Sequence, residues 1–145
     1  MKEALYPKIY IYRRLVQAKL FIDAHFNKAI NLDAIADEAH FSKYHFIRIF
    51  KKTYRQTPHQ YLINVRVEQA KKLLQTNIPV ADACYTCGFE SISSFTTLFK
   101  KMTNRTPAEY RQQQLDLTTD RLLKPLKYIP ACFAEKHGWL KNSNF

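Results

Sequence analysis

The chain has 145 residues, of which 46% are hydrophobic, and it carries a formal net charge of +11 at pH 7. This length suits one ordinary domain or two very small ones, and the apolar content is sufficient for a packed core. A strong positive charge attracts polyanions, which include nucleic acids and anionic membranes. The composition therefore predicts a folded protein with an anionic partner.

Several classes of protein are disfavoured by what the chain lacks. Two glycines are too few for a turn-rich β fold or a glycine-rich phosphate loop. No apolar run approaches the roughly 18 residues that cross a bilayer, and the N-terminal residues do not resemble a signal peptide. Three cysteines, an odd number, do not suggest a disulfide framework. We therefore expect a helical protein of the cytoplasm with no membrane partner.

Hydrophobic periodicity predicts a long helix and then a short one in the first part of the chain. The long helix is expected over residues 9–26, and its predicted apolar positions are Tyr12, Leu15, Val16, Leu20, Phe21 and Ala24. The short helix is expected over residues 32–39, with Asn31 or Asp33 as its N-cap. Its apolar stripe comprises Ile35, Ala36 and Ala39.

A break at residues 40–42 precedes two more predicted helices. Ser42 is a candidate N-cap for a helix over residues 43–53, and this helix would bury Phe46, Ile49 and Phe50. Thr57 and Pro58 fit the cap and first position of a long helix that reaches about residue 75. The inward positions expected for this long helix are Tyr61, Leu62, Val65, Ala70, Leu73 and Leu74.

The chain then repeats the pattern of its first half. The stretch FKKTYRQTPHQY at residues 50–61 is matched by FKKMTNRTPAEY at residues 99–110. The apolar residues Phe95, Leu98 and Phe99 likewise match Phe46, Ile49 and Phe50. Each copy consists of a short helix, a tight turn and a second helix. The repeat therefore predicts a helix-turn-helix unit that occurs twice.

The second helix of the first copy leaves a stripe without acidic residues opposite its apolar face. The stripe comprises Tyr44, Ile47, Arg48 and Lys51. A helix fits the major groove of DNA, where Arg can bind guanine through two hydrogen bonds and an aliphatic side chain can contact a thymine methyl. Arg48 and Ile47 are therefore candidate base readers. The candidate phosphate contacts are Lys43, Lys51, Lys52 and Arg55.

The matching stripe of the second copy has smaller side chains and a single charge. It comprises Ser93, Thr96, Thr97 and Lys100, with Ile92 and Ser94 beside it. The candidate phosphate contacts of this copy are Lys100, Lys101 and Arg105. A polar helix face is usually no more than a solvated surface. Two such faces on the same frame, in a chain with this charge, favour a nucleic-acid interface instead.

The chain resembles the DNA-binding domain of the AraC/XylS family of bacterial transcription regulators. The stretches that carry the resemblance are INLDAIADEAHFSKYHFIRIFKK, TPHQYLINVRVEQAKKLL and IPVADACYTCGFESISSFTTLFKKMTNRTPAEYR. The resemblance runs from about residue 16 to residue 111. It implies an all-α fold in which a linker helix, residues 58–75, joins two helix-turn-helix subdomains at residues 1–57 and 76–111. Residues 112–145 would form a C-terminal extension.

The same resemblance implies recognition helices at residues 43–52 and 92–101, which would enter successive major grooves of double-stranded DNA. The base readers that it implies are Tyr44, Ile47 and Arg48 in the first helix and Ile92, Ser93, Ser94, Thr96 and Thr97 in the second. Family members often have Arg or Gln where this chain has Ser93 or Thr97, so we expect weaker base readout by the second helix. They commonly have Gly where this chain has His40.

The resemblance also implies a transcription regulator that binds specific DNA sequences. We expect no cofactor, no metal and no enzymatic activity. RNA polymerase is a candidate partner. Two alternatives are a protein that binds nucleic acid without specificity and a redox-sensing regulator that uses Cys84 and Cys87. These cysteines align with Ala36 and Ala39 of the first copy, and a zinc site would need two further ligands. We therefore expect both cysteines to be packed in a core.

The C-terminal residues 112–145 lie outside the resemblance. They are too apolar for a disordered tail and too few for an effector domain. We expect them to pack against the second subdomain. The alternatives are contact with a partner, with a second copy of the chain, or with a small ligand.

Overall fold

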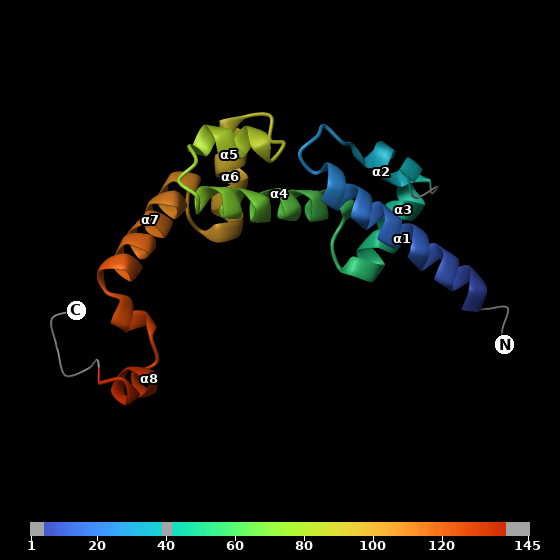
Figure 1. The fold of residues 1–145 in the computed structure, drawn as a ribbon. Helices are drawn as coiled ribbons and strands as arrows, with labels where there is room; N and C mark the ends of the chain where they lie inside the picture. Colours follow the sequence, from blue (N-terminus) through green and yellow to red (C-terminus); the bar gives the residue numbers. More distant parts are fainter. Residues whose placement is uncertain (1–4, 39–41, 139–145) are drawn as a thin grey trace.

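The computed structural model describes residues 5–38 and 42–138, which form helices and no strand. In chain order the helices are α1 (Leu5–His25), α2 (Leu32–Glu38), α3 (Lys43–Tyr54), α4 (Pro58–Leu74), α5 (Val80–Thr86), α6 (Ile92–Thr103), α7 (Pro107–Leu123), the 3-10 helix η1 (Pro125–Tyr128) and α8 (Ala131–Lys136). Figure 1 shows α1, α2 and α3 grouped at one end of α4 and α5 and α6 at its other end. The predicted all-α fold of two helix-turn-helix units joined by a long helix is confirmed.

The first unit is built around a hydrophobic core that we call core 1. Its buried members are Leu15, Ala18, Ile22, Ile35, Ala36, Phe46, Phe50 and Leu62. The ring of Phe50 meets Phe46 edge-on at 5.5 Å and Tyr61 at 5.9 Å between centroids. A fully buried Phe side chain contributes roughly 1.5–3 kcal/mol through the hydrophobic effect. These rings therefore fix α3 against the start of α4.

The second unit has a matching core that we call core 2. Its buried members are Val67, Ala70, Leu74, Ala83, Cys84, Cys87, Phe89, Phe95 and Phe99. The ring of Phe99 meets both Phe95 and Tyr110 edge-on at 5.5 Å. This arrangement repeats the one in core 1, with α6 in place of α3 and α7 in place of α4.

Helix α4 contributes to both cores, because Leu62 lies in core 1 and Val67 in core 2. The predicted cap of α4 is confirmed: the Thr57 hydroxyl accepts a hydrogen bond from the Gln60 backbone at 3.2 Å, with Pro58 at the first helical position. The helix ends at Leu74, one residue before the predicted end. Val67 is fully buried although it was not among the expected inward positions.

The buried face of α1 differs from the prediction. Leu15, Ala18 and Ile22 are fully buried, whereas Val16 is 47% exposed and Leu20 is 57% exposed. Tyr12 and Ala24, also predicted on the apolar face, are exposed as well. The cause is that α1 carries two apolar stripes, and periodicity alone cannot tell which stripe a neighbouring helix will cover.

The helix caps in the first unit agree only in part with the prediction. The Asn31 side chain caps α2, since its Oδ1 accepts a hydrogen bond from the Ala34 backbone at 2.8 Å. Ser42 occupies the N-cap position of α3 with an extended backbone, but its side chain makes no capping hydrogen bond. Ala39 and His40 lie outside the described residues.

The C-terminal extension does not begin as a separate segment at residue 112. Helix α7 runs without interruption from Pro107 to Leu123 and crosses the expected boundary. The predicted packing of the extension against the second unit is wrong for Leu122, Leu123 and Phe133, which are 78%, 70% and 47% exposed. Figure 1 shows α8 well away from α5 and α6. None of the described helices is long and apolar enough to cross a membrane.

Candidate nucleic-acid interface

Helix α3 is held by Phe46 and Phe50, and the burial of these rings turns its opposite face towards solvent. Tyr44 is 80% exposed, and Arg48, one turn further along, is also exposed. Ile47 is half-buried, so only part of its side chain reaches the surface. The structure thus brings Tyr44 and Arg48 together on one exposed stripe, with Ile47 at its edge.

Basic side chains surround this stripe. Lys51, Lys52 and Arg55 are exposed near the C-terminal end of α3, and within the described ranges none of them forms an ion pair. Lys43 pairs with Asp33 at 3.3 Å between Nζ and Oδ1, with both side chains largely exposed. An exposed pair of this kind contributes about 0–1 kcal/mol, so a phosphate can displace it at little cost.

Helix α6 repeats the anchoring of α3 through its two buried Phe rings. Of the predicted readers, Ile92, Ser93, Ser94 and Thr97 are exposed, and Thr96 is half-buried. Ser93, Ser94 and Thr97 line a shallow hollow together with Leu98. The structure therefore brings these small polar side chains together on one face, as it does for the larger ones of α3.

Some hydroxyl groups of α6 are already bonded within the helix. Thr97 Oγ1 donates a hydrogen bond to the Ser93 carbonyl at 3.0 Å. Ser91 Oγ caps the helix by accepting from the Ser94 backbone at 3.2 Å, and it donates to Ser94 Oγ at 3.0 Å. A guanidinium offers five donors in a fixed fork, whereas a hydroxyl offers one. The face of α6 is thus a weaker hydrogen-bonding surface than that of α3.

Cationic side chains also lie near the C-terminal end of α6. Lys100, Lys101 and Arg105 are exposed, and in the described part of the chain none of them forms an ion pair. The nearby carboxylate of Glu109 accepts a hydrogen bond from the Thr106 backbone at 2.8 Å. This bond, together with the charges of Lys100 and Arg105, lowers the pKa of Glu109. The Glu109 carboxylate is therefore engaged in capping α7.

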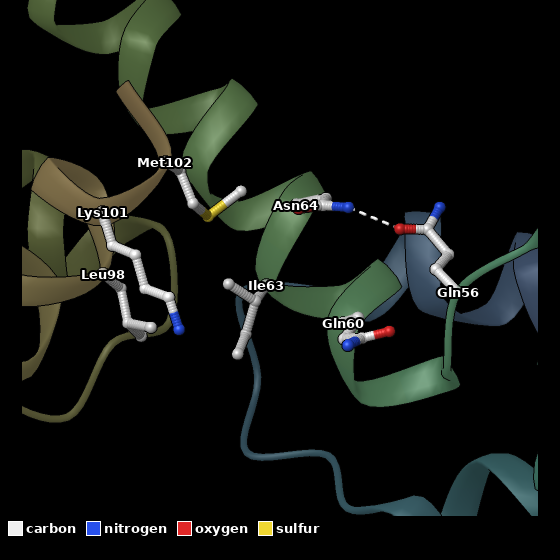
Figure 2. Close-up of a pocket in the computed structure, with 7 residues that line it drawn as sticks. All are labelled: Gln56, Gln60, Ile63, Asn64, Leu98, Lys101 and Met102. Carbon is white, nitrogen blue, oxygen red and sulfur yellow. Dashed lines mark hydrogen bonds between the residues drawn. The ribbon is translucent and has the colours of Figure 1, made fainter. Parts of the chain in front are cut away.

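A groove of about 300 Å³ lies between α4 and α6. Figure 2 shows the side chains that line it, which are Gln56, Gln60, Ile63, Asn64, Leu98, Lys101 and Met102. Asn64 donates a side-chain hydrogen bond to Gln56 across the first turn of α4. The groove combines an apolar floor with amide groups and the Lys101 ammonium, and it adjoins the hollow beside Thr97 because Leu98 lines both.

The cysteines of α5 and its C-cap lie in core 2. Cys84 and Cys87 are fully buried free thiols. Burial raises the pKa of Cys87 to about 11 and also raises that of Cys84. Thiols with such pKa values are protonated at neutral pH and react poorly. The described residues contain no cluster of three or more potential metal ligands. A packing role fits both cysteines, and the redox-sensing alternative is not favoured.

Arg66 is a polar residue of α4 that was not among the predicted site residues. It occupies a half-buried position on the stripe that includes Leu62, Ala70 and Leu74. Its guanidinium donates hydrogen bonds to the carbonyls of Phe26 and Lys28 at 2.7 and 2.9 Å. The sequence feature that could have identified this residue is an Arg at helical spacing within an otherwise apolar stripe.

Comparison with known proteins gives a consistent result. The profile of a family described as "Helix-turn-helix domain" matches residues 35–113. The chain is 43% identical over 93 residues to the bifunctional transcriptional activator/DNA repair enzyme AdaA of Bacillus subtilis, a match that covers 63% of this chain and 44% of AdaA. Other curated relatives are also named as transcription regulators.

Solved structures agree with this assignment. The DNA-binding domain of the global transcriptional factor AdpA, solved in complex with a target DNA, matches with a TM-score of 0.66 and 28% identity and covers 77% of this chain and 96% of that domain. An AraC-type transcriptional regulator from Chromobacterium violaceum matches with a TM-score of 0.65 and 28% identity over 71% of this chain and 93% of that one. The chain belongs to the AraC/XylS family of helix-turn-helix DNA-binding transcription regulators.

Proposed function

We propose that this chain binds specific sequences in double-stranded DNA and thereby regulates transcription, with α3 and α6 in successive major grooves. The observation that carries the proposal is the duplicated frame. Two helices are each fixed by a pair of buried Phe rings, and each presents a face without acidic residues. Two such helices on one chain can read an asymmetric site, because no two-fold axis relates them.

In this proposal the two helices contribute unequally to sequence readout. Arg48 binds a guanine edge, Ile47 contacts a thymine methyl, and Tyr44 contacts the adjoining base or sugar. On α6 the readers are Ile92, Ser93, Ser94, Thr96 and Thr97, which offer single hydroxyls and small apolar contacts. The first helix therefore supplies most of the discrimination between base pairs.

The exposed cations bind phosphates and fix the protein on the duplex. The first unit contributes Lys43, Lys51, Lys52 and Arg55, and the second contributes Lys100, Lys101 and Arg105. Lys101 also lines the groove between α4 and α6, where three amide side chains provide further donors. This groove is suited to the DNA backbone that runs between the two major grooves.

We infer that the chain acts by binding rather than by catalysis. The repair activity in the name of AdaA belongs to that protein. The exposed apolar side chains of Leu122, Leu123 and Phe133 support a protein contact through residues 112–145, either with RNA polymerase or with a second copy of the chain. Co-purification with RNA polymerase and light scattering of the isolated chain distinguish these two partners.

Selection from a pool of random duplex DNA at near-physiological salt tests the proposed function. We expect the retained DNA to contain two enriched blocks about one helical turn apart, roughly 34 Å. One enriched block would mean that α3 reads and α6 only anchors. An absence of enrichment, with binding retained, would overturn the proposal in favour of a protein that binds nucleic acid without specificity.

Substitutions in α3 separate base readout from phosphate binding. Arg48→Ala is expected to weaken binding to the selected site far more than binding to random DNA, by about 1–3 kcal/mol. Lys51→Ala should weaken both alike and reduce the salt dependence of binding. Fluorescence anisotropy at several salt concentrations measures both effects, and equal losses on both DNAs for Arg48→Ala would remove Arg48 from the readers.

A further inference from the structure

Arg66 lies on α4 between the two cores, and its contacts reach both units. It donates from Nε to the Phe26 carbonyl at 2.7 Å and from Nη2 to the Lys28 carbonyl at 2.9 Å. Both carbonyls belong to the loop between α1 and α2 in the first unit. On the other side, its guanidinium carbon lies 5.9 Å from the ring centroid of Phe89, a member of core 2. One side chain thus contacts the first and the second unit at once.

The backbone of the second unit also approaches this loop closely. Gly88, in the turn between α5 and α6, has a φ of +85°, and a Cβ at this position would lie 2.7 Å from the Phe26 carbonyl oxygen and 3.0 Å from Asn27 Cα. No side chain fits at these distances. The turn of the second unit is therefore pressed against the loop of the first, on the carbonyl that Arg66 holds. Figure 1 shows this loop and this turn facing each other above α4.

Other connections between the units are sparse. Within the described residues, no helix among α1, α2 and α3 packs extensively against α5, α6 or α7, so α4 is the main connection. A single helix bends and twists more readily than a helix braced by a second contact. Burial lowers the pKa of Arg66, and the charge of Glu90 opposes that effect. Placing a guanidinium here has a desolvation cost, which its two carbonyl partners offset.

We propose that Arg66, together with Gly88, is a positioning element that fixes the separation and rotation of α3 relative to α6 and so sets which spacing between two DNA half-sites the protein accepts. Arg66 contacts no DNA in this scheme and acts through the loop at Phe26–Lys28. The inference rests on the proposed function for its effect on DNA. The brace itself exists without DNA, which allows a separate test.

The geometry of DNA makes the affinity for sites with different half-site spacings a sensitive test of how rigidly the two units are held. One inserted base pair moves the second half-site by about 3.4 Å and rotates it by about 35° around the duplex. A rigid protein loses one set of contacts when this happens. A protein whose two units can move relative to each other adapts at a smaller cost, because each unit keeps its own recognition face.

The first experiment measures affinity for the selected site and for versions with one base pair inserted or deleted between the half-sites. We expect Arg66→Ala to reduce the preference for the native spacing by at least about fivefold, while single-base changes within a half-site keep their effect. Arg66→Lys keeps the charge but lacks the planar fork that donates from both Nε and Nη2, so it should fall between wild type and Arg66→Ala. An unchanged spacing preference in Arg66→Ala would overturn the proposal.

Arg111→Ala is the matched control. Arg111 is also half-buried and also holds a loop, since its Nη2 donates to the backbone carbonyl and side-chain oxygen of Asn77 at 3.2 and 2.6 Å. Both partners of that bond lie in the second unit. The variant removes the same charge and a similar pair of bonds, so it should lower thermal stability without changing the spacing preference. A similar change of spacing in both variants would show a general loss of structure and would contradict the proposal.

A measurement without DNA separates the failure of this inference from the failure of the proposed function. Spin labels at Lys52→Cys on α3 and Lys100→Cys on α6, in a Cys132→Ser background, report the distance between the recognition helices. Wild type should give a narrow distance distribution, and Arg66→Ala or Gly88→Ala a broader or displaced one. If the distributions coincide, the brace does not exist, whatever the protein selects from random DNA.

Discussion

The two helix-turn-helix units have similar cores but different exposed faces. In core 1 the buried rings of Phe46 and Phe50 pack edge-on with Tyr61 beside them, and in core 2 the rings of Phe95, Phe99 and Tyr110 repeat this arrangement. The exposed faces have diverged, from Tyr and Arg on α3 to Ser and Thr on α6. Packing constrains a buried ring in size and shape, whereas an exposed side chain is constrained mainly by what it binds. In the proposed function, the duplicated frame therefore presents two different faces to DNA.

The helix ends show the same contrast at a finer scale. Thr57 and Thr106 form capping boxes at the start of α4 and α7, but the reciprocal partner is Gln60 in the first box and Glu109 in the second. Helices α3 and α6 both end at a residue with left-handed backbone, Arg55 at φ 62° and Asn104 at φ 61°. The backbone path is thus conserved between the units while the chemistry of its side chains varies.

The largest expected effect comes from removing a buried Phe ring from either core. Phe50→Ala in core 1 and Phe99→Ala in core 2 should each lower the free energy of unfolding by about 3–5 kcal/mol, because each leaves a cavity among the aromatic rings that surround it. Urea denaturation followed by circular dichroism measures the loss. Phe→Leu at the same positions is the control and should cost less. A loss in one unit below about 1 kcal/mol would show that the two cores are not energetically equivalent.

The next prediction compares how much the exposed faces of α3 and α6 contribute to DNA binding. Thr97→Ala should weaken binding to the selected site by no more than about 1 kcal/mol, because the Thr97 hydroxyl is already bonded to the Ser93 carbonyl. This loss is smaller than the one expected for Arg48→Ala. Titration of both variants against the same labelled duplex makes the comparison, and a larger loss for Thr97→Ala would reverse the proposed division of readout.

A smaller difference concerns the N-caps of α3 and α6. Ser91→Ala removes a side-chain hydrogen bond to the Ser94 backbone and should cost about 1 kcal/mol of stability. Ser42→Ala should cost only a few tenths, since Ser42 makes no capping bond. Thermal melts of the two variants test this order. Ser91→Asn retains an acceptor and should restore most of the stability.

The smallest effect is a pH dependence confined to the second capping box. The pKa of Glu109 in the folded chain lies below its ordinary value of 4.5, chiefly because the Thr106 backbone donates to its carboxylate. The stabilisation is therefore present above pH 4.5 and is lost as the pH falls through the lower folded pKa. Glu109→Gln should remove this dependence, and Gln60→Glu should create one in the first unit. Unfolding midpoints measured from pH 6 down to pH 3 would show no difference among the three proteins if the box contributes nothing.

The sequence by itself determined the duplicated frame. The repeated Phe, Thr-Pro and Tyr positions predicted the two helix-turn-helix units, the Thr57 cap of α4 and the buried Phe pairs of α3 and α6, because each depends on local spacing and on residue type. Those same positions predicted which faces of α3 and α6 would be exposed, apart from the half-buried Ile47 and Thr96.

Only the tertiary structure decided which contacts join distant parts of the chain. Helix α1 has two apolar stripes, and the packing of the neighbouring helices buries the one formed by Leu15, Ala18 and Ile22. The tertiary structure also brought Arg66 to the carbonyls of Phe26 and Lys28 and placed Gly88 against the same loop. Such contacts depend on where whole helices dock, and local periodicity carries no information about docking because it records only which residues share a face.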